Sequence, residues 1–195
     1  MTNNLTAEER KLAELILYIS GKCLTHERFG ATKLNKILFF SDFIFFKQHG
    51  RAITGVDYFK LPQGPAPKCL LKVRESMVSE RDLAIAHRPL PDGRIQQRTI
   101  PLRASRISEF FDAEEIDVVN QVIDILWDKS AEEVSELSHL YVIGWKLYDL
   151  KDIIPYHSVF GRIMSDEYVT ALDLERAEQV AKKHGLLKTS SIPKL

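Results

Sequence analysis

The 195-residue sequence has few cysteines, no excess charge of either sign and no long hydrophobic run. Only Cys23 and Cys69 occur, and no second thiol lies near either, so the pattern favours a reducing compartment over a disulfide scaffold. The longest apolar-rich run, residues 37–46, is interrupted by Ser41 and Asp42 and is too short to span a bilayer. The polar N-terminus has no signal-peptide hydrophobic region. We therefore expect a cytoplasmic protein with no membrane contact.

The charge balance argues against a nucleic-acid-binding protein. The 27 Lys and Arg residues equal the 27 Asp and Glu residues, whereas nucleic-acid binders usually carry a basic excess that neutralises phosphates. Several basic residues do share local stretches of the chain: Lys68, Lys72, Arg74, Arg94, Arg98, Arg103 and Arg106. No aromatic residues alternate with them to stack bases, so we interpret them as a solvated surface. A nucleic-acid-binding regulator stays an alternative.

The sequence has no pattern typical of a catalytic or cofactor site. None of its six histidines lies at metal-ligand spacing from another, so we predict no metal and no cofactor. Three prolines around Gly64 remove backbone N–H groups that a phosphate-binding loop would need. The G-x-S-x-G motif of serine hydrolases is absent. We predict a protein that is not an enzyme; a site built from Asp42, His139 and a serine is the alternative.

The periodicity of apolar residues predicts a mainly helical fold. An S/T-x-x-E capping box at residues 6–9 opens the first helix, which Gly21 should end. The helix over 32–48 is apolar on nearly every side and should lie at the centre, with Gly50 as its stop. Further helical segments are predicted over 68–79, 112–126, 130–137 and 170–184, with another helix or turn over 138–147.

Short extended segments complete the predicted fold. The Pro91-Asp92-Gly93 turn lies between residues 83–87 and 94–102 and indicates a β-hairpin. Residues 57–61 should be extended and residues 62–67 should form a loop. We predict an α+β, predominantly α fold: a compact bundle of about six helices around the central helix, with a small β-hairpin or sheet. One domain should cover residues 1–187, followed by a flexible C-terminal tail over 188–195.

Several short blocks resemble one known family. Residues 33–43, KLNKILFFSDF, resemble the K-L-x-K-L-L-x-x-x-D helix of the Panacea domain in the SocA-like antitoxin family. GRAITG at 50–55, Tyr58 and LPQGPAP at 61–67 are similar to the block that follows it there. The later motifs are Ser138-His139, Trp145 and Ile154-Pro155-Tyr156. The blocks occur in the family's order, and the resemblance covers roughly residues 7–156.

The resemblance implies an antitoxin-like role. The family is linked to prophages and mobile elements, and its members neutralise protein toxins encoded beside them. The implied partner is a cognate protein toxin, neutralised by direct contact without catalysis. An adaptor that delivers its partner to a cellular protease is an alternative. Self-association stays open.

The candidate partner-binding residues come from the family motifs and from one helix that is rich in phenylalanine. They are Lys33, Lys36, Phe40, Asp42, Arg51, Tyr58, Gln63, Gly64, Pro65, His139 and Trp145. Most of the phenylalanines at 39, 40, 43, 45 and 46 should be core, leaving one or two for a contact surface. The motif residues have two equally weighted interpretations: a contact surface, or a framework with an internal Lys36–Asp42 polar network.

Overall fold

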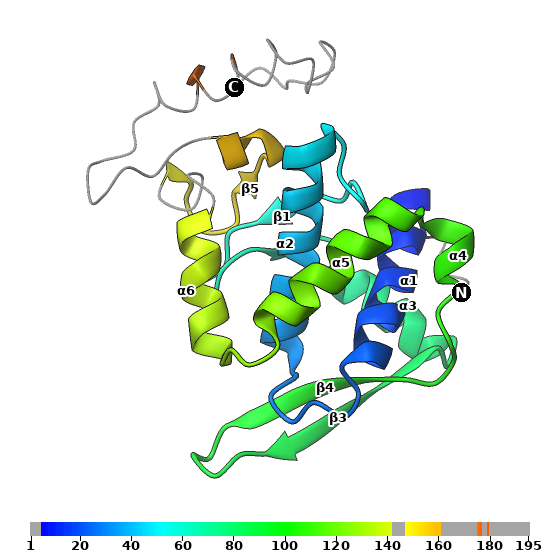
Figure 1. Ribbon diagram of the computed structural model, residues 1–195. Coiled ribbons are helices and arrows are strands. Elements are labelled where there is room, and N and C mark those ends of the chain that lie inside the picture. Colours follow the sequence, from blue (N-terminus) through cyan, green and yellow to red (C-terminus); the bar gives the residue numbers. More distant parts are fainter. Residues whose placement is uncertain (1–4, 142–146, 161–174, 177–178, 180–195) are drawn as a thin grey trace.

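A computed structural model describes residues 5–141, 147–160, 175–176 and 179. This part of the chain contains six α-helices and the short 3-10 helix η1: α1 (Ala7–Lys22), α2 (Ala31–His49), α3 (Leu70–Ser79), α4 (Ile107–Phe110), α5 (Ala113–Leu126), α6 (Ala131–Tyr141) and η1 (Tyr156–Phe160). Helix α2 runs through the middle, α5 crosses it, and α6 flanks it on the side opposite α1 and α3 (Figure 1). The predicted central helix and the predominantly helical α+β class are confirmed. None of the described helices has both the length and the hydropathy needed to cross a bilayer.

The predicted capping signals mark real helix ends. The Thr6 hydroxyl accepts the N–H of Glu9 at 3.2 Å, and the Glu9 carboxylate accepts the N–H of Thr6 at 2.9 Å. The boxes at residues 112–115 and 130–133 make the same reciprocal pair of bonds. Gly50 ends α2 in the left-handed region with φ 72°. These signals succeed because each depends on groups within one turn of chain.

Some predicted boundaries were wrong. Helix α1 continues beyond Gly21 to Lys22, since an isolated glycine is tolerated in a helix whose other face is buried. Helix α6 continues through Ser138 and His139 to Tyr141, so these residues do not begin a separate helix. Helix α4 was not predicted, because four residues are too few to show a helical period. The predicted helix over 170–184 (apart from residues 175, 176 and 179) and the predicted tail over 188–195 lie outside the described residues.

The strands form two separate antiparallel sheets. The predicted hairpin is confirmed: β3 (Leu83–Pro89) pairs with β4 (Ile95–Pro101), with Leu83 opposite Pro101. The second sheet has β1 (Tyr58–Phe59) in the middle, β2 (Ala66–Pro67) on one side and β5 (Ile153–Ile154) on the other. The prediction that residues 62–67 are all loop was therefore wrong at β2. An edge strand accommodates Pro67 because one side of it needs no backbone donor.

The core is built on the aromatic face of α2. Phe39, Phe43 and Phe45 are fully buried, and the rings of Phe39 and Phe43 lie 4.4 Å apart between centroids. Tyr58 from β1 and Tyr156 from η1 pack on the same cluster. The expectation that most of these phenylalanines are core is confirmed.

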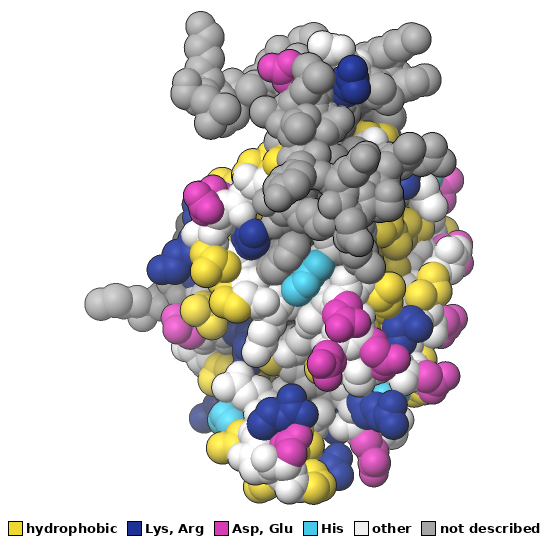
Figure 2. Space-filling model, turned by 90° about the vertical axis from the view of Figure 1, so that its left-hand side faces the viewer, with side chains coloured by type: hydrophobic (Ala, Val, Ile, Leu, Met, Phe, Trp, Pro, Cys, Tyr) yellow, Lys and Arg dark blue, Asp and Glu magenta, His cyan; other side chains and the backbone are white. Residues whose placement is uncertain are grey.

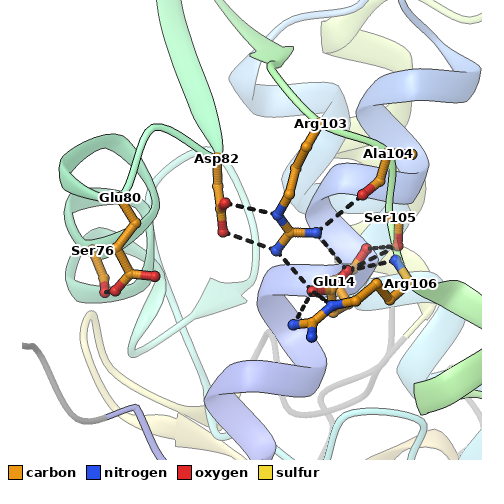
Figure 3. Close-up of polar contacts among 8 residues, drawn as sticks. All are labelled: Glu14, Ser76, Glu80, Asp82, Arg103, Ala104, Ser105 and Arg106. Carbon is orange, nitrogen blue, oxygen red and sulfur yellow. Dashed lines mark hydrogen bonds and ion pairs between the residues drawn. The ribbon is translucent and has the colours of Figure 1, made fainter.

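A buried ion-pair cluster fastens the hairpin to α1 (Figure 3). The Arg103 guanidinium donates to both carboxylate oxygens of Asp82, at 2.7 and 2.8 Å, and to Glu14 at 2.8 Å. The Arg106 N–H and the Ser105 hydroxyl also donate to Glu14. Burial alone would raise the pKa of Glu14, but the bonds from Arg103 and Arg106 lower it to about 2. The sequence assigned these arginines to a solvated surface, but both pair with the buried Glu14 carboxylate while staying partly exposed themselves.

Candidate functional site

Asp42 joins α2 to the GRAITG loop at residues 50–55. Its carboxylate is fully buried and accepts the Thr54 N–H at 2.7 Å, the Thr54 hydroxyl at 2.5 Å and the Tyr58 hydroxyl at 2.8 Å. Burial raises the pKa of Asp42, and the hydrogen bonds from Thr54 and Tyr58 oppose that rise. The three donors therefore hold the loop and β1 against the central helix.

Two other motif residues fasten the ends of α5. Arg51 forms ion pairs with Asp112 at 2.7 Å and Glu115 at 2.5 Å, at the N-terminal end of α5. At the other end, the Lys33 ammonium donates to the Trp127 carbonyl at 2.6 Å, where a cation complements the helix dipole. Burial lowers the pKa of Lys33. Lys33 and Arg51 thus set the position of α5 across α2.

Lys36 is a buried cation that donates to a neutral carbonyl. Its residue surface is only 2% exposed, and its ammonium donates to the Pro65 carbonyl at 3.1 Å. Burial lowers the pKa of Lys36 to about 7. Gly64 has φ +98°, and a Cβ atom there would lie 2.4 Å from Lys36 Nζ and 2.6 Å from Ser138 Oγ. Glycine is required at residue 64 by its backbone conformation and by this close approach.

A pocket of about 280 Å³, with both polar and apolar lining residues, opens beside this contact. It is lined by Thr32, Asn35, Lys36, Leu61, Pro62, Gln63 and Gly64. The buried Asn35 Oδ1 has no hydrogen-bond partner in the described part of the chain. His139 lies close by on α6: burial lowers its pKa, and so do the positive charges of Lys36 and Lys60. The structure thus brings Lys36, Gln63, Gly64, Pro65 and His139 together.

An apolar groove of about 330 Å³ lies between α2, α5 and α6. It is lined by Phe40, Ile44, Val122, Ile125, Leu126, Leu137 and Tyr141. Ile125 is 63% exposed and Leu137 is 38% exposed, so both add accessible apolar surface to the groove. Phe40 is therefore the phenylalanine of α2 that reaches a groove.

Three exposed carboxylates lie close along the chain to groove residues of α5 and α6. Glu133 and Glu136 are exposed on α6 next to Leu137, and Asp124 is exposed on α5 next to Ile125. Figure 2, which views the α6 side of the molecule, shows carboxylates gathered on this face with hydrophobic side chains beside them. A segment that filled the groove would meet an apolar floor, with these carboxylates on α5 and α6 and the Lys47 ammonium 5.8 Å from the centroid of the Tyr141 ring.

The candidate residues thus separate into distinct places. Phe40 lies in the groove, Asp42 and Tyr58 lie in one buried network, and Lys33 and Arg51 lie at opposite ends of α5. The framework interpretation paired Lys36 with Asp42, but Asp42 accepts hydrogen bonds from Thr54 and Tyr58, and Lys36 donates to Pro65. Trp145 lies outside the described residues.

Sequence reasoning missed the residues that complete these sites. Asn35 in the pocket and Ile125 and Leu137 in the groove were not candidates. Ile125 did carry a signal, because it lies off the apolar stripe of Ile116, Val119, Ile123 and Leu126 that faces the core. Asn35 carried none, because its lack of a partner is visible only after folding.

The alternative of an enzyme required a site built from Asp42, His139 and a serine, and the acid and the serine next to His139 both have hydrogen-bond partners inside the fold. The Asp42 carboxylate is occupied by Thr54 and Tyr58, and the Ser138 hydroxyl donates to the Ser135 carbonyl at 2.7 Å. Over the residues that the structure describes, no three His, Cys, Asp or Glu side chains cluster as metal ligands would.

Comparison with known proteins identifies the family. The model of the antitoxin SocA-like, Panacea domain matches residues 34–146, more than half of the chain. The comparisons with curated proteins and with solved structures found no match to this chain. The matched segment includes all seven residues that line the groove, as well as Lys36, Asp42 and Gly64. The chain therefore belongs to the SocA-like antitoxin family that carries the Panacea domain.

Proposed function

We propose that this protein is antitoxin-like: it binds a cognate protein toxin directly and holds it inactive by protein–protein contact, without catalysis. Family membership over residues 34–146 is the observation that carries this proposal. The same segment supplies an exposed apolar groove, the kind of surface that a soluble protein uses for a partner.

The groove between α2, α5 and α6 is the contact surface we assign to the toxin. Ile125 and Leu137 offer exposed aliphatic surface, and the Phe40 and Tyr141 rings line the groove with them. Buried aromatic and aliphatic anchors provide most of the binding energy in protein interfaces. A stable complex buries on the order of 1,200–2,000 Å², so the groove would form the centre of a larger contact.

The exposed carboxylates near the groove residues define the partner segment. Glu133, Glu136 and Asp124 favour a toxin segment that carries Lys or Arg beside its apolar residues. An amphipathic helix or loop with an apolar stripe and basic flanks fits this surface. These carboxylates would mainly speed association and select the partner, whereas the apolar floor would slow dissociation.

The buried motif residues support this surface from inside the fold. Asp42 and Tyr58 have no exposed surface and cannot touch a toxin while the protein is folded. With Lys33 and Arg51, they fix the positions of α2 and α5, which form two walls of the groove. We assign these four residues to the framework and Phe40 to the contact.

Co-expression with the protein encoded beside this one tests the proposal. We expect the neighbour to stop growth alone, to be harmless with this protein, and to co-purify with it. Ile125→Asp should abolish protection and co-purification while its far-UV circular dichroism and melting temperature stay unchanged. Leu71→Asp is the matched control, because Leu71 is 71% exposed on α3 and lies outside the groove.

Two results would count against the proposal, and they are distinguishable. A neighbour that is harmless alone, or that never associates with this protein, would remove the antitoxin role. Full protection by a folded Ile125→Asp variant would leave that role intact but move the contact away from the groove.

A further inference from the structure

We propose that the pocket beside Gly64 is a binding site for a carboxylate group, with the Lys36 ammonium as its cation and Asn35 as a second polar contact. The pocket shares no lining residue with the apolar groove, so this site stands apart from the proposed toxin contact. The class of ligand follows from the charge and the hydrogen-bonding groups of the residues that line the pocket.

The first argument is a cation without a counter-ion. Lys36 forms no ion pair with any described residue, and its hydrogen bond goes to a neutral carbonyl, that of Pro65. The buried ammonium can donate three hydrogen bonds, so it has donors left for a ligand. A buried charge is costly unless an opposite charge pairs with it, and a ligand anion would supply that charge. Titratable lysines that line pockets often mark functional sites.

The second argument is access. Gly64 has no side chain over Lys36 Nζ, where a Cβ atom would lie only 2.4 Å from the nitrogen. Gly64 therefore places no side-chain atoms between the loop backbone and the Lys36 ammonium. The pocket of about 280 Å³ has room for a carboxylate and the few atoms attached to it.

The third argument selects a carboxylate over a phosphate. A phosphate group carries more than one negative charge and is usually held by several donors, such as arginines or a row of backbone N–H groups. This pocket has one lysine in its lining, and the Gly64 N–H is already donated to the Leu61 carbonyl at 2.8 Å. A single charge and a short donor set match a singly charged carboxylate.

Asn35 refines the ligand class. Its buried Oδ1 has no partner among the described residues, and a rotation of this pocket-lining side chain would let it accept a hydrogen bond from a donor on the ligand. A carboxylate with an N–H a few bonds away meets both needs. Such a group occurs in N-acylated amino acids and at the C-terminus of a peptide chain, and the two share the chemistry proposed here.

Binding at Lys36 should depend on pH. Only the ammonium form attracts the anion, and burial lowers the pKa of Lys36 to about 7, so affinity should fall about tenfold per pH unit above that value. The nearby titratable groups are His139 on α6 and Lys60 after β1, and both add positive charge when protonated.

Side-chain NMR of the full chain tests the site with N-acetylglycine as the probe. We expect a saturable shift of the Lys36 side-chain signal, absent with the neutral analogue N-acetylglycinamide and weaker at pH 8.5 than at pH 6. Lys36→Met should lose binding and remain folded. Lys72→Met is the matched control and should keep binding, because Lys72 pairs with Glu9 on α1.

Two further probes separate the possible ligands. At least tenfold tighter binding of a tripeptide with a free C-terminus than of acetate would assign the site to chain ends. Similar binding of both would assign it to small carboxylic acids. A Lys36 signal that no carboxylate moves, or that N-acetylglycinamide moves equally, would overturn the proposal, as would stronger binding of inorganic phosphate.

Discussion

At the residue scale, Lys36 and Asp42, two of the three buried ionisable residues of α2, have opposite surroundings. Asp42 is surrounded by three donors from Thr54 and Tyr58, whereas Lys36 donates to one neutral carbonyl. Buried charges are tolerated when hydrogen bonds replace their hydration. Asp42 therefore stabilises the fold through its partners, whereas Lys36 lowers the stability of the ligand-free protein.

Asp42→Ala should destabilise the protein by roughly 2–4 kcal/mol, because it leaves the Thr54 N–H and the Thr54 and Tyr58 hydroxyls without their acceptor. Urea unfolding measures the change. Asp124→Ala is the control and should alter stability by less than about 0.5 kcal/mol, because Asp124 is exposed. Equal effects of the two substitutions would contradict the framework role of Asp42.

Lys36→Met should stabilise the protein at pH 6 by roughly 2–4 kcal/mol, because it removes a buried charge. Burial lowers the pKa of Lys36 from 10.5 in the unfolded chain to about 7, so the unfolded state binds more protons between these values. The stability of the unmodified protein therefore rises with pH across that window, and the advantage of the variant should shrink. Thermal unfolding from pH 6 to 10 would refute this if the gap stayed constant.

At the element scale, long-range ion pairs and hydrogen bonds position the helices and the hairpin. Arg51 and Lys33 hold α5 at its two ends, and the Glu14–Arg103 cluster holds the β3–β4 hairpin against α1. Each cluster joins segments that are far apart in sequence, as Figure 3 shows for the hairpin. The walls of the groove depend on these contacts as much as on the core.

Glu14→Gln should cost on the order of 2 kcal/mol at pH 7, because it removes the buried partner of Arg103 and Arg106. The folded-state pKa of Glu14 is lowered from 4.5 to about 2, so its contribution is complete above pH 4.5 and is lost as the pH falls to 2. Melting curves of both proteins should therefore converge across that range. Glu109→Gln, at an exposed position on α4, should match the unmodified protein throughout.

At the scale of the whole molecule, one core joins the family segment to its flanks. Residues from α1, α2, α5 and η1 belong to the same hydrophobic cluster, so the matched segment 34–146 does not hold the complete core. Helix α1 lies before this segment and η1 lies after it (Figure 1). The groove therefore relies on residues outside the segment that defines the family.

Thiol labelling should report this cooperativity. Burial raises the pKa of Cys23 to about 11, and the residue is almost inaccessible after α1. We expect a reagent that modifies accessible thiols to label Cys23 at pH 7 only when the whole domain unfolds. The labelling rate of Cys23 should therefore follow the global stability in urea. Mass spectrometry of the labelled peptide measures that rate. Labelling that is fast and independent of urea would indicate local opening at the end of α1.

The sequence by itself determined the features that depend on neighbouring residues. The capping boxes, the Gly50 stop, the Pro91-Asp92-Gly93 turn and the apolar helix over 32–48 were all predictable, because each is decided within a few residues of chain. The ordered family blocks were also visible in the sequence. They indicated the family without showing which of their residues reach the surface.

Only the tertiary structure decided how distant segments meet. The pairing of Tyr58 with Ile154, the burial of Glu14 beneath Arg103, and the approach of Lys36 to Gly64 and Ser138 join residues far apart in the chain. No local pattern encodes such contacts, because each exists only when the whole core has fixed the helices in place. The exposed position of Ile125 and the Asn35 Oδ1, which has no hydrogen-bond partner in the described part of the chain, follow from the same packing and belong to the two proposed sites.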